Sequence, residues 1–231
     1  MHIGLIGGIG PAATQFYYRG LVRAYASADR AMELTIVHAD VRDLLGNLSK
    51  GAAQEQAQIF LGFVQRLKAA GADAAAVTSL AGHFCIQELE AISPLPIINA
   101  LPELDKYIAQ RKLARVGLLG TRNAMETGLY GGISSAEIVL PQGEDLDETH
   151  ANYVPMATSG HATDQQREFF FSAVRKLCQD QGADAVVFAG TDMFLAFEGH
   201  DCGFPVIDGG QVHIDAIVRE SGLPNLLVPL V

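Results

Sequence analysis

The sequence predicts an α/β protein made of two similar halves, each a three-layer α/β/α unit with a parallel sheet. Strand-like apolar runs alternate with amphipathic helical runs along the chain, as in parallel-sheet proteins. One strand pattern also occurs twice. Gly71-Ala72-Asp73 and Gly182-Ala183-Asp184 each follow a helical run and open a short apolar strand, 111 residues apart (182 − 71).

Two further strand pairs repeat at nearly the same offset. Ile3 and Val116 are 113 residues apart, and Pro96 and Pro205 are 109 apart. Ligands of parallel α/β sheets bind beyond the carboxyl ends of the strands. The repeat therefore predicts a ligand cleft between two pseudo-symmetric halves, with residues 1–98 plus 208–231 in the first and residues 99–207 in the second.

Composition narrows the class of protein and of partner. The chain has 231 residues, 49% of them apolar, and a formal net charge of −10 without a Lys/Arg block. This argues against nucleic acid and anionic membrane surfaces as partners. No apolar run approaches the ~20 residues of a membrane span. Three cysteines without metal-ligand spacing indicate reduced thiols, a cytoplasmic location and no metal site.

The first half opens with Met1–Ile6, a continuous apolar run typical of a strand buried on both faces. Gly7–Pro11 then turns into a helix over 12–26, with Pro11 at its first position. The turn is either a cradle of main-chain N–H groups for a carboxylate or a tight turn without a ligand. The rest of this half is predicted as a strand at 33–39, a short helix or loop at 41–48, a helix at 52–70, a strand at 74–77, a short helix at 84–91 and a strand at 95–99.

The second half follows a predicted helix over Leu101–Arg111. Its first strand, Arg115–Leu119, leads into Gly120-Thr121-Arg122-Asn123, which resembles the N-terminal strand and its glycine turn. Further elements are predicted as a strand at 137–140, a helix at 164–179, strands at 185–188 and 205–208, a helix at 212–220 and an apolar strand or strap at 223–231.

These segments resemble the aspartate/glutamate racemase family over nearly the whole chain. The resemblance rests on Gly7–Pro11, Gly120–Arg122 with Met125-Glu126, the two Gly-Ala-Asp strands, and Pro205–Asp208 with His213. It implies cofactor-free inversion of an amino-acid α-carbon by two acid/base groups, normally one cysteine from each half. It also implies substrate contacts from Gly8, Ile9, Thr121, Arg122, Asn123 and Thr191.

Both cysteine positions of the family are substituted in this sequence. The first motif, roughly Cys-Asn-Thr-Ala-His, aligns with Ser79–His83, and the second, roughly Gly-Cys-Thr-Glu, aligns with Ala189–Asp192. A hydroxyl replaces the first thiol, and Gly190 offers no side chain at the second. The two-thiol mechanism is therefore predicted to be absent. The candidate catalytic set becomes Ser79 with His83 on one side and Asp192 on the other.

Each candidate also has a structural explanation. Ser79 could cap the next helix, His83 could hold a loop, and Asp192 could bond the backbone. Cys85 and Cys178 are expected to be packing residues, whereas Cys202 stays a reserve candidate.

Three functions remain open at this point. They are an isomerase of small amino or carboxylic acids with altered groups, a binding or regulatory protein that has lost its chemistry, and a one-base decarboxylase or cis–trans isomerase. The expected partner is a small carboxylate or amino-acid ligand, with a homodimer left open.

Overall fold

The computed structural model describes residues 1–224, whose contacts form two compact units. The first comprises Met1–Ala100 with the described residues from His213 on, and the second comprises Leu101–Val212. The sequence-based division assigns 208–212 to the first half instead; Asp208, however, pairs with Phe188 in the second unit's sheet. Most of the predicted strap at 223–231 lies outside the described residues. Among those described, no helix is long and apolar enough to cross a bilayer.

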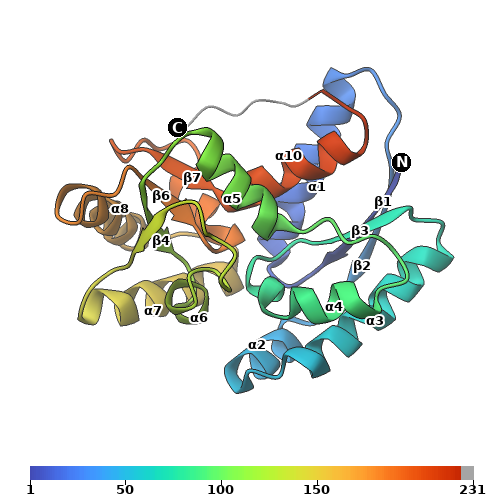
Figure 1. The fold of residues 1–231 in the computed structure, drawn as a ribbon, viewed down its shortest axis with the longest axis horizontal. Coiled ribbons are helices and arrows are strands. Elements are labelled where there is room, and N and C mark those ends of the chain that lie inside the picture. The colour runs from blue at the N-terminus through green and yellow to red at the C-terminus, as the bar shows by residue number, and fades with distance from the viewer. Residues whose placement is uncertain (225–231) are drawn as a thin grey trace. The chain divides into compact units, whose positions relative to one another are not determined.

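The first unit holds a three-stranded parallel sheet in the order β2-β1-β3 (Figure 1). Ile3 and Leu5 of β1 share a buried cluster with residues of α1 and α10, whereas Gly4 faces Leu67 of α3. Alternate residues of the central strand therefore meet helices on opposite faces. The elements are β1 (His2–Gly7), α1 (Pro11–Ser27), β2 (Glu33–His38), α2 (Val41–Lys50), α3 (Ala53–Ala69), β3 (Ala74–Val77), the 3₁₀ turn η1 (Ala81–Cys85), α4 (Ile86–Ile92) and α10 (Gly209–Glu220).

The second unit repeats this topology with a four-stranded parallel sheet in the order β5-β4-β6-β7. The registers correspond as well, since Ile3 lies opposite Ala74 in one sheet and Val116 lies opposite Ala185 in the other. The α/β prediction with parallel sheets is confirmed. The elements are α5 (Ala100–Gln110), β4 (Arg115–Leu119), α6 (Arg122–Glu126), β5 (Glu137–Val139), α7 (Glu144–Ser159), α8 (Asp164–Gln179), β6 (Ala185–Phe188), the 3₁₀ turn η2 (Thr191–Met193), α9 (Phe194–Phe197) and β7 (Val206–Asp208).

The strand predicted at Leu95–Asn99 is reduced to a single bridge between Ile97 and Ala75. The N–H of Ala75 donates to the Pro96 carbonyl, and the N–H of Ile98 donates to the Ala75 carbonyl. Pro96 has no N–H of its own, which limits how far the ladder can extend. The predicted strand is wrong in length but right in position beside β3.

Helix α7 is absent from the sequence-based assignment. It runs for 16 residues with Pro155 inside it, and a proline in a helix interior normally argues against a helix. Its packing outweighs that cost, because Thr149, Tyr153 and Met156 are all buried along one side.

The repeated Gly-Ala-Asp motif joins a helix to two strands at once. Gly71 and Gly182 have φ of 92° and 70°, a region that favours glycine at helix ends. The carboxylate of Asp73 accepts the His2 N–H at 2.7 Å, while the N–H of Asp73 donates to the His2 carbonyl at 2.9 Å. The motif therefore fixes the register of β3 against β1 where the strands begin.

The second unit has the same tie. The Asp184 carboxylate accepts the N–H groups of Ala114 and Arg115 at 2.7 and 3.0 Å, and the N–H of Asp184 donates to the Arg115 carbonyl at 2.8 Å. One carboxylate thus satisfies two N–H groups at the start of β4.

We predict that Asp184→Ala lowers the free energy of unfolding by about 1–2 kcal/mol, because two main-chain donors lose a charged acceptor. Chemical denaturation measures the loss. Asp184→Asn should recover part of it, and Glu168→Ala, at an exposed position of α8, serves as the control. Equal stability of Asp184→Ala and Glu168→Ala would contradict a stabilising role for the hydrogen bonds of the Asp184 carboxylate.

Candidate functional site

The end of β3 places Ser79 beside a histidine whose ring bonds only the main chain. Nδ1 of His83 donates to the Ser79 carbonyl at 2.8 Å, and Nε2 accepts the Ala100 N–H at 3.3 Å. Both ring nitrogens are used, so neither is left for the Ser79 hydroxyl. Ser79 is buried, and no described residue bonds its hydroxyl. The geometry thus differs from the predicted Ser79–His83 pair and favours the structural explanation for His83.

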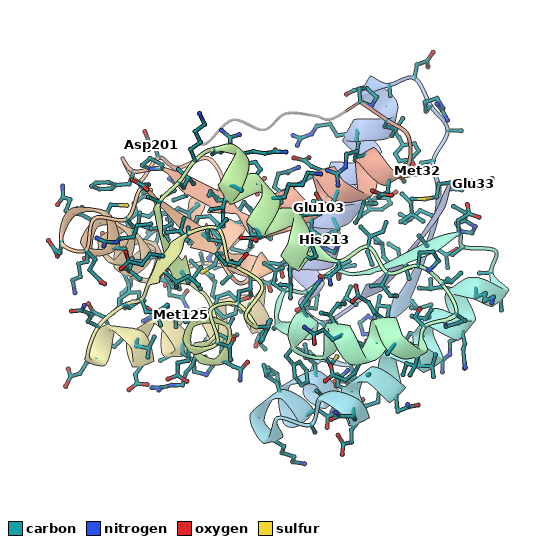
Figure 2. All side chains as sticks on the ribbon, viewed as in Figure 1. Met32, Glu33, Glu103, Met125, Asp201 and His213 are labelled. Carbon is teal, nitrogen blue, oxygen red and sulfur yellow. The ribbon has the colours of Figure 1, made fainter. Side chains whose placement is uncertain are left out.

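A second buried histidine extends the same network. His213, labelled on α10 in Figure 2, donates from Nε2 to the Ile98 carbonyl at 2.7 Å and accepts the Tyr17 hydroxyl at Nδ1 at 2.8 Å. Its ring packs edge-to-face on His83, with centroids 5.4 Å apart. Burial lowers the pKa of His83 to about 4 and the pKa of His213 to about 3. Both rings are therefore neutral at pH 7.

The glycine turn after β1 is closed by its own helix. The Gly8 N–H donates to the Thr14 hydroxyl at 2.9 Å, so it is not the bare donor that a carboxylate cradle requires. Gly8 has φ of 88°, and a β-carbon there would lie 2.5 Å from the Ala39 carbonyl oxygen. Ile9 is buried, and its Cδ1 lies near Gly82. These contacts favour the tight-turn alternative.

The turn after β4 is also tied internally. The Thr121 hydroxyl caps α6 by accepting the Ala124 N–H at 3.2 Å. The Arg122 guanidinium pairs with Glu126 at 2.8 Å and with Asp147, and the main-chain N–H of Arg122 donates to Nδ1 of His150 at 3.2 Å. Asn123 accepts the Thr127 hydroxyl at its carbonyl. Of the residues predicted to hold substrate at this turn, Thr121 is buried, while Arg122 and Asn123 are half-buried.

The turn after β6 holds a buried hydroxyl and a buried carboxylate in adjacent residues. Thr191 is 1% exposed, and no described residue bonds its hydroxyl. Asp192, beside it, is also buried, and the Tyr153 hydroxyl donates to its Oδ2 at 3.4 Å. A β-carbon on Gly120 would lie 3.1 Å from the Gly190 nitrogen, so the ends of β4 and β6 approach closely. An unbonded buried hydroxyl next to a buried carboxylate is the clearest candidate site in the second unit.

Helix α7 brings two side chains that the sequence reasoning missed. His150 meets the turn after β4, and Tyr153, three residues further, meets the turn after β6. Residues three apart share a helix face. The spacing of these two aromatic residues was the available signal, but it carried no meaning without the helix.

The three cysteines lack the environment of a reactive thiol. Burial raises the pKa of Cys85 to about 12, and its Sγ donates to the Gly82 carbonyl at 3.4 Å. Burial also raises the pKa of Cys178 and of Cys202, and both pack against the core of the second unit. None of the three has the lowered pKa of a reactive thiol.

Comparison with known proteins decides the family. The Asp/Glu/Hydantoin racemase family matches residues 6–217. The chain belongs to this family. A candidate Asp/Glu racemase from Yersinia pestis is 26% identical, with a TM-score of 0.79 over 96% of this chain and 99% of that chain.

Two further structures share the racemase fold at lower identity. An aspartate racemase homologue from Pyrococcus horikoshii is 20% identical, with a TM-score of 0.78 over 96% of this chain and 99% of that one. Aspartate racemase from Picrophilus torridus is 18% identical, with a TM-score of 0.79 over 97% of this chain and 96% of that one. The racemase fold is therefore present over almost the full length.

Because His83 and His213 are buried, we expect the free energy of unfolding to depend on pH. Their pKa values fall from 6.5 in the unfolded chain to about 4 and about 3 in the folded protein, so the unfolded state binds more protons between these values. Stability is fully present above pH 6.5 and is lost as the pH falls toward 4. Each histidine should lower the free energy of unfolding by about 2 kcal/mol between pH 7 and pH 5.

Denaturation at pH 7, 6 and 5 measures this slope. His213→Gln, which cannot titrate, should reduce the slope between pH 6 and pH 5 by about one proton. A variant with the wild-type slope would show that His213 is not the group responsible.

Proposed function

We propose that this racemase-family chain is a cofactor-free isomerase of a small amino acid or carboxylic acid, with a non-standard acid/base set. The observation that carries the proposal is the buried, unbonded Thr191 hydroxyl beside the buried Asp192 carboxylate. Such a hydroxyl costs about 1–3 kcal/mol when it lacks a partner. A ligand carboxylate oxygen would accept its hydrogen bond and recover that cost.

The ionisable group of the proposed chemistry lies in the second unit. A serine hydroxyl needs a partner base, and both nitrogens of His83 are bonded to the main chain. Asp192 lies in the turn after β6, and a carboxylate is a group that can accept a proton. We therefore propose Asp192 as the base and Thr191 as the carboxylate-binding group, and we expect no proton transfer from Ser79.

This assignment favours one-base chemistry. A single base supports α-proton exchange, as well as the decarboxylation or cis–trans isomerisation left open by the sequence. One structure with the same fold is named as an aspartate racemase, which makes acidic amino acids the first substrates to test.

A binding or regulatory protein is the second candidate. It is favoured by the absence of a thiol at both family positions, Ser79 and Gly190. A binding protein would bind the same ligand as the proposed isomerase but would not transfer a proton. One experiment therefore separates the two functions.

The experiment is α-proton exchange in deuterated water, followed by NMR with L- and D-amino acids and small carboxylic acids. We expect exchange with at least one of them. Asp192→Asn should reduce the rate by 10²-fold or more, because it removes the base. Ser79→Ala should stay within about tenfold of wild type, and Cys85→Ser serves as a control for a buried residue without a chemical role.

The outcomes separate the alternatives. Saturable binding without exchange would establish the binding protein and reject the isomerase. An equal loss in Ser79→Ala and Asp192→Asn would instead support the two-sided mechanism that the sequence repeat suggests.

Thr191→Val tests the ligand contact separately. It removes an unbonded hydroxyl, so the free protein should be as stable as wild type or up to about 1–3 kcal/mol more stable, while ligand affinity falls 10- to 100-fold. The matched control is Thr149→Val, because the buried Thr149 hydroxyl donates to the Asp145 carbonyl at 2.7 Å. That variant should lose about 0.5–1.5 kcal/mol. Equal destabilisation of the two variants would show that the Thr191 hydroxyl is already bonded.

A further inference from the structure

The glycine at position 190 is not required by its backbone. Its φ of −137° and ψ of 125° are extended values that any residue adopts. Gly8, with φ of 88°, is the opposite case. The reason for glycine at 190 must therefore be space.

The side chain that fills this space is Tyr153. A β-carbon built on Gly190 would lie 2.5 Å from both Oη and Cζ of Tyr153 and 2.6 Å from Cε2. These distances are far inside van der Waals contact, so the phenol occupies the volume where a side chain of residue 190 would begin. In the family motif that side chain is the second cysteine.

The phenol is held in this position by packing. Tyr153 is 4% exposed and belongs to a buried cluster with Met156, Phe170 and Met193. Its ring therefore cannot move aside without disturbing the core of the unit.

The hydroxyl of Tyr153 is placed as a donor. It donates to Oδ2 of Asp192 at 3.4 Å and lies beside the turn that holds Thr191. Burial, and then the charge of the Asp192 carboxylate, raises the pKa of Tyr153 well above its ordinary value. The phenol is therefore protonated at neutral pH and is poorly suited to act as a base.

We propose that Tyr153 takes the place of the side chain missing at position 190 and presents its hydroxyl to the ligand as the proton donor of the second unit. The ligand class, an α-amino or carboxylic acid, rests on the proposed function. The spatial replacement rests on the geometry alone.

The proton transfers balance within the unit. The Asp192 carboxylate takes the α-proton, and the C–H electron pair moves into the ligand's carboxyl group. The Tyr153 O–H bond then breaks as a new C–H bond forms on that carbon. Transfer of the proton from Asp192 to the Tyr153 oxygen, across their 3.4 Å contact, restores both groups. Because the two oxygens are this close, both transfers use one face of the carbon and give exchange without inversion. In deuterated water the exchangeable Tyr153 proton is deuterium, so the carbon becomes labelled.

The spatial part is tested by a double-mutant cycle on thermal stability. Gly190→Ala should lower Tm by roughly 3–10 °C, because the new methyl group overpacks the site. In a Tyr153→Leu background, which lacks the outer ring atoms, the same change should shift Tm by less than about 2 °C.

Two controls complete the cycle. Tyr153→Phe keeps the ring, so Gly190→Ala should lower its Tm as much as it does in wild type. Gly62→Ala, in α3 with nothing within 4 Å of its β-carbon, should not lower Tm. Equal effects of Gly190→Ala in the wild-type and Tyr153→Leu backgrounds would overturn the inference, whatever the activity.

The chemical part is tested with Tyr153→Phe. We expect α-proton exchange to fall 10²-fold or more while ligand affinity changes less than tenfold, because only the donor is lost. Wild-type exchange in this variant would overturn the donor role. A wild-type protein that neither binds nor exchanges any ligand overturns the proposed function, whereas the stability cycle still decides the replacement.

Discussion

The carboxylate ties of Asp73 and Asp184 set the geometry on which the rest of each unit depends. Each aspartate follows a helix-ending glycine and bonds the first residues of the neighbouring central strand. This fixes the register of β3 on β1 and of β6 on β4 from their amino ends. Because parallel strands rise about 3.3 Å per residue, a fixed start also fixes where each strand ends. The polar turns that follow the carboxyl ends of the strands are thus positioned from the opposite end of the sheet.

The polar turns that follow the strands differ between the two units. In the first unit His83 bonds two backbone groups and Thr14 closes the Gly8 turn, whereas the Ser79 hydroxyl is bonded by no described residue. In the second unit the turn after β6 keeps a buried hydroxyl unbonded and a carboxylate in contact with a phenol. Satisfied polar groups stabilise a fold, whereas an unsatisfied one is retained at a cost. This difference favours a structural role for His83 and the Gly8 turn, and it supports the proposed ligand contact at Thr191.

The sequence was sufficient to predict the strands and helices of both units because each of these elements has a local sequence pattern. Buried apolar runs, amphipathic spacing and Gly-Ala-Asp motifs predict strands, helices and their order. The prediction failed where tertiary contacts decide. Helix α7 was not predicted. It contains Pro155, and its stability comes from the packing of Thr149, Tyr153 and Met156. Pro96 shortened the strand at Leu95–Asn99 to one bridge. The roles of His83 and Gly8 depend on bonds to Ala100 and Thr14, which motif matching does not reveal.

Position 190 shows why a motif read residue by residue is incomplete. In the sequence-based alignment, Gly190 takes the position of the second cysteine and offers no side chain there. In the folded unit the same volume contains the Tyr153 ring and hydroxyl, delivered by a helix 37 residues earlier in the chain (190 − 153). A thiol and a phenol differ in acidity, and burial beside Asp192 widens the difference. Under the proposed mechanism, the phenol keeps a proton near the ligand, and the Asp192 carboxylate takes the role of accepting one.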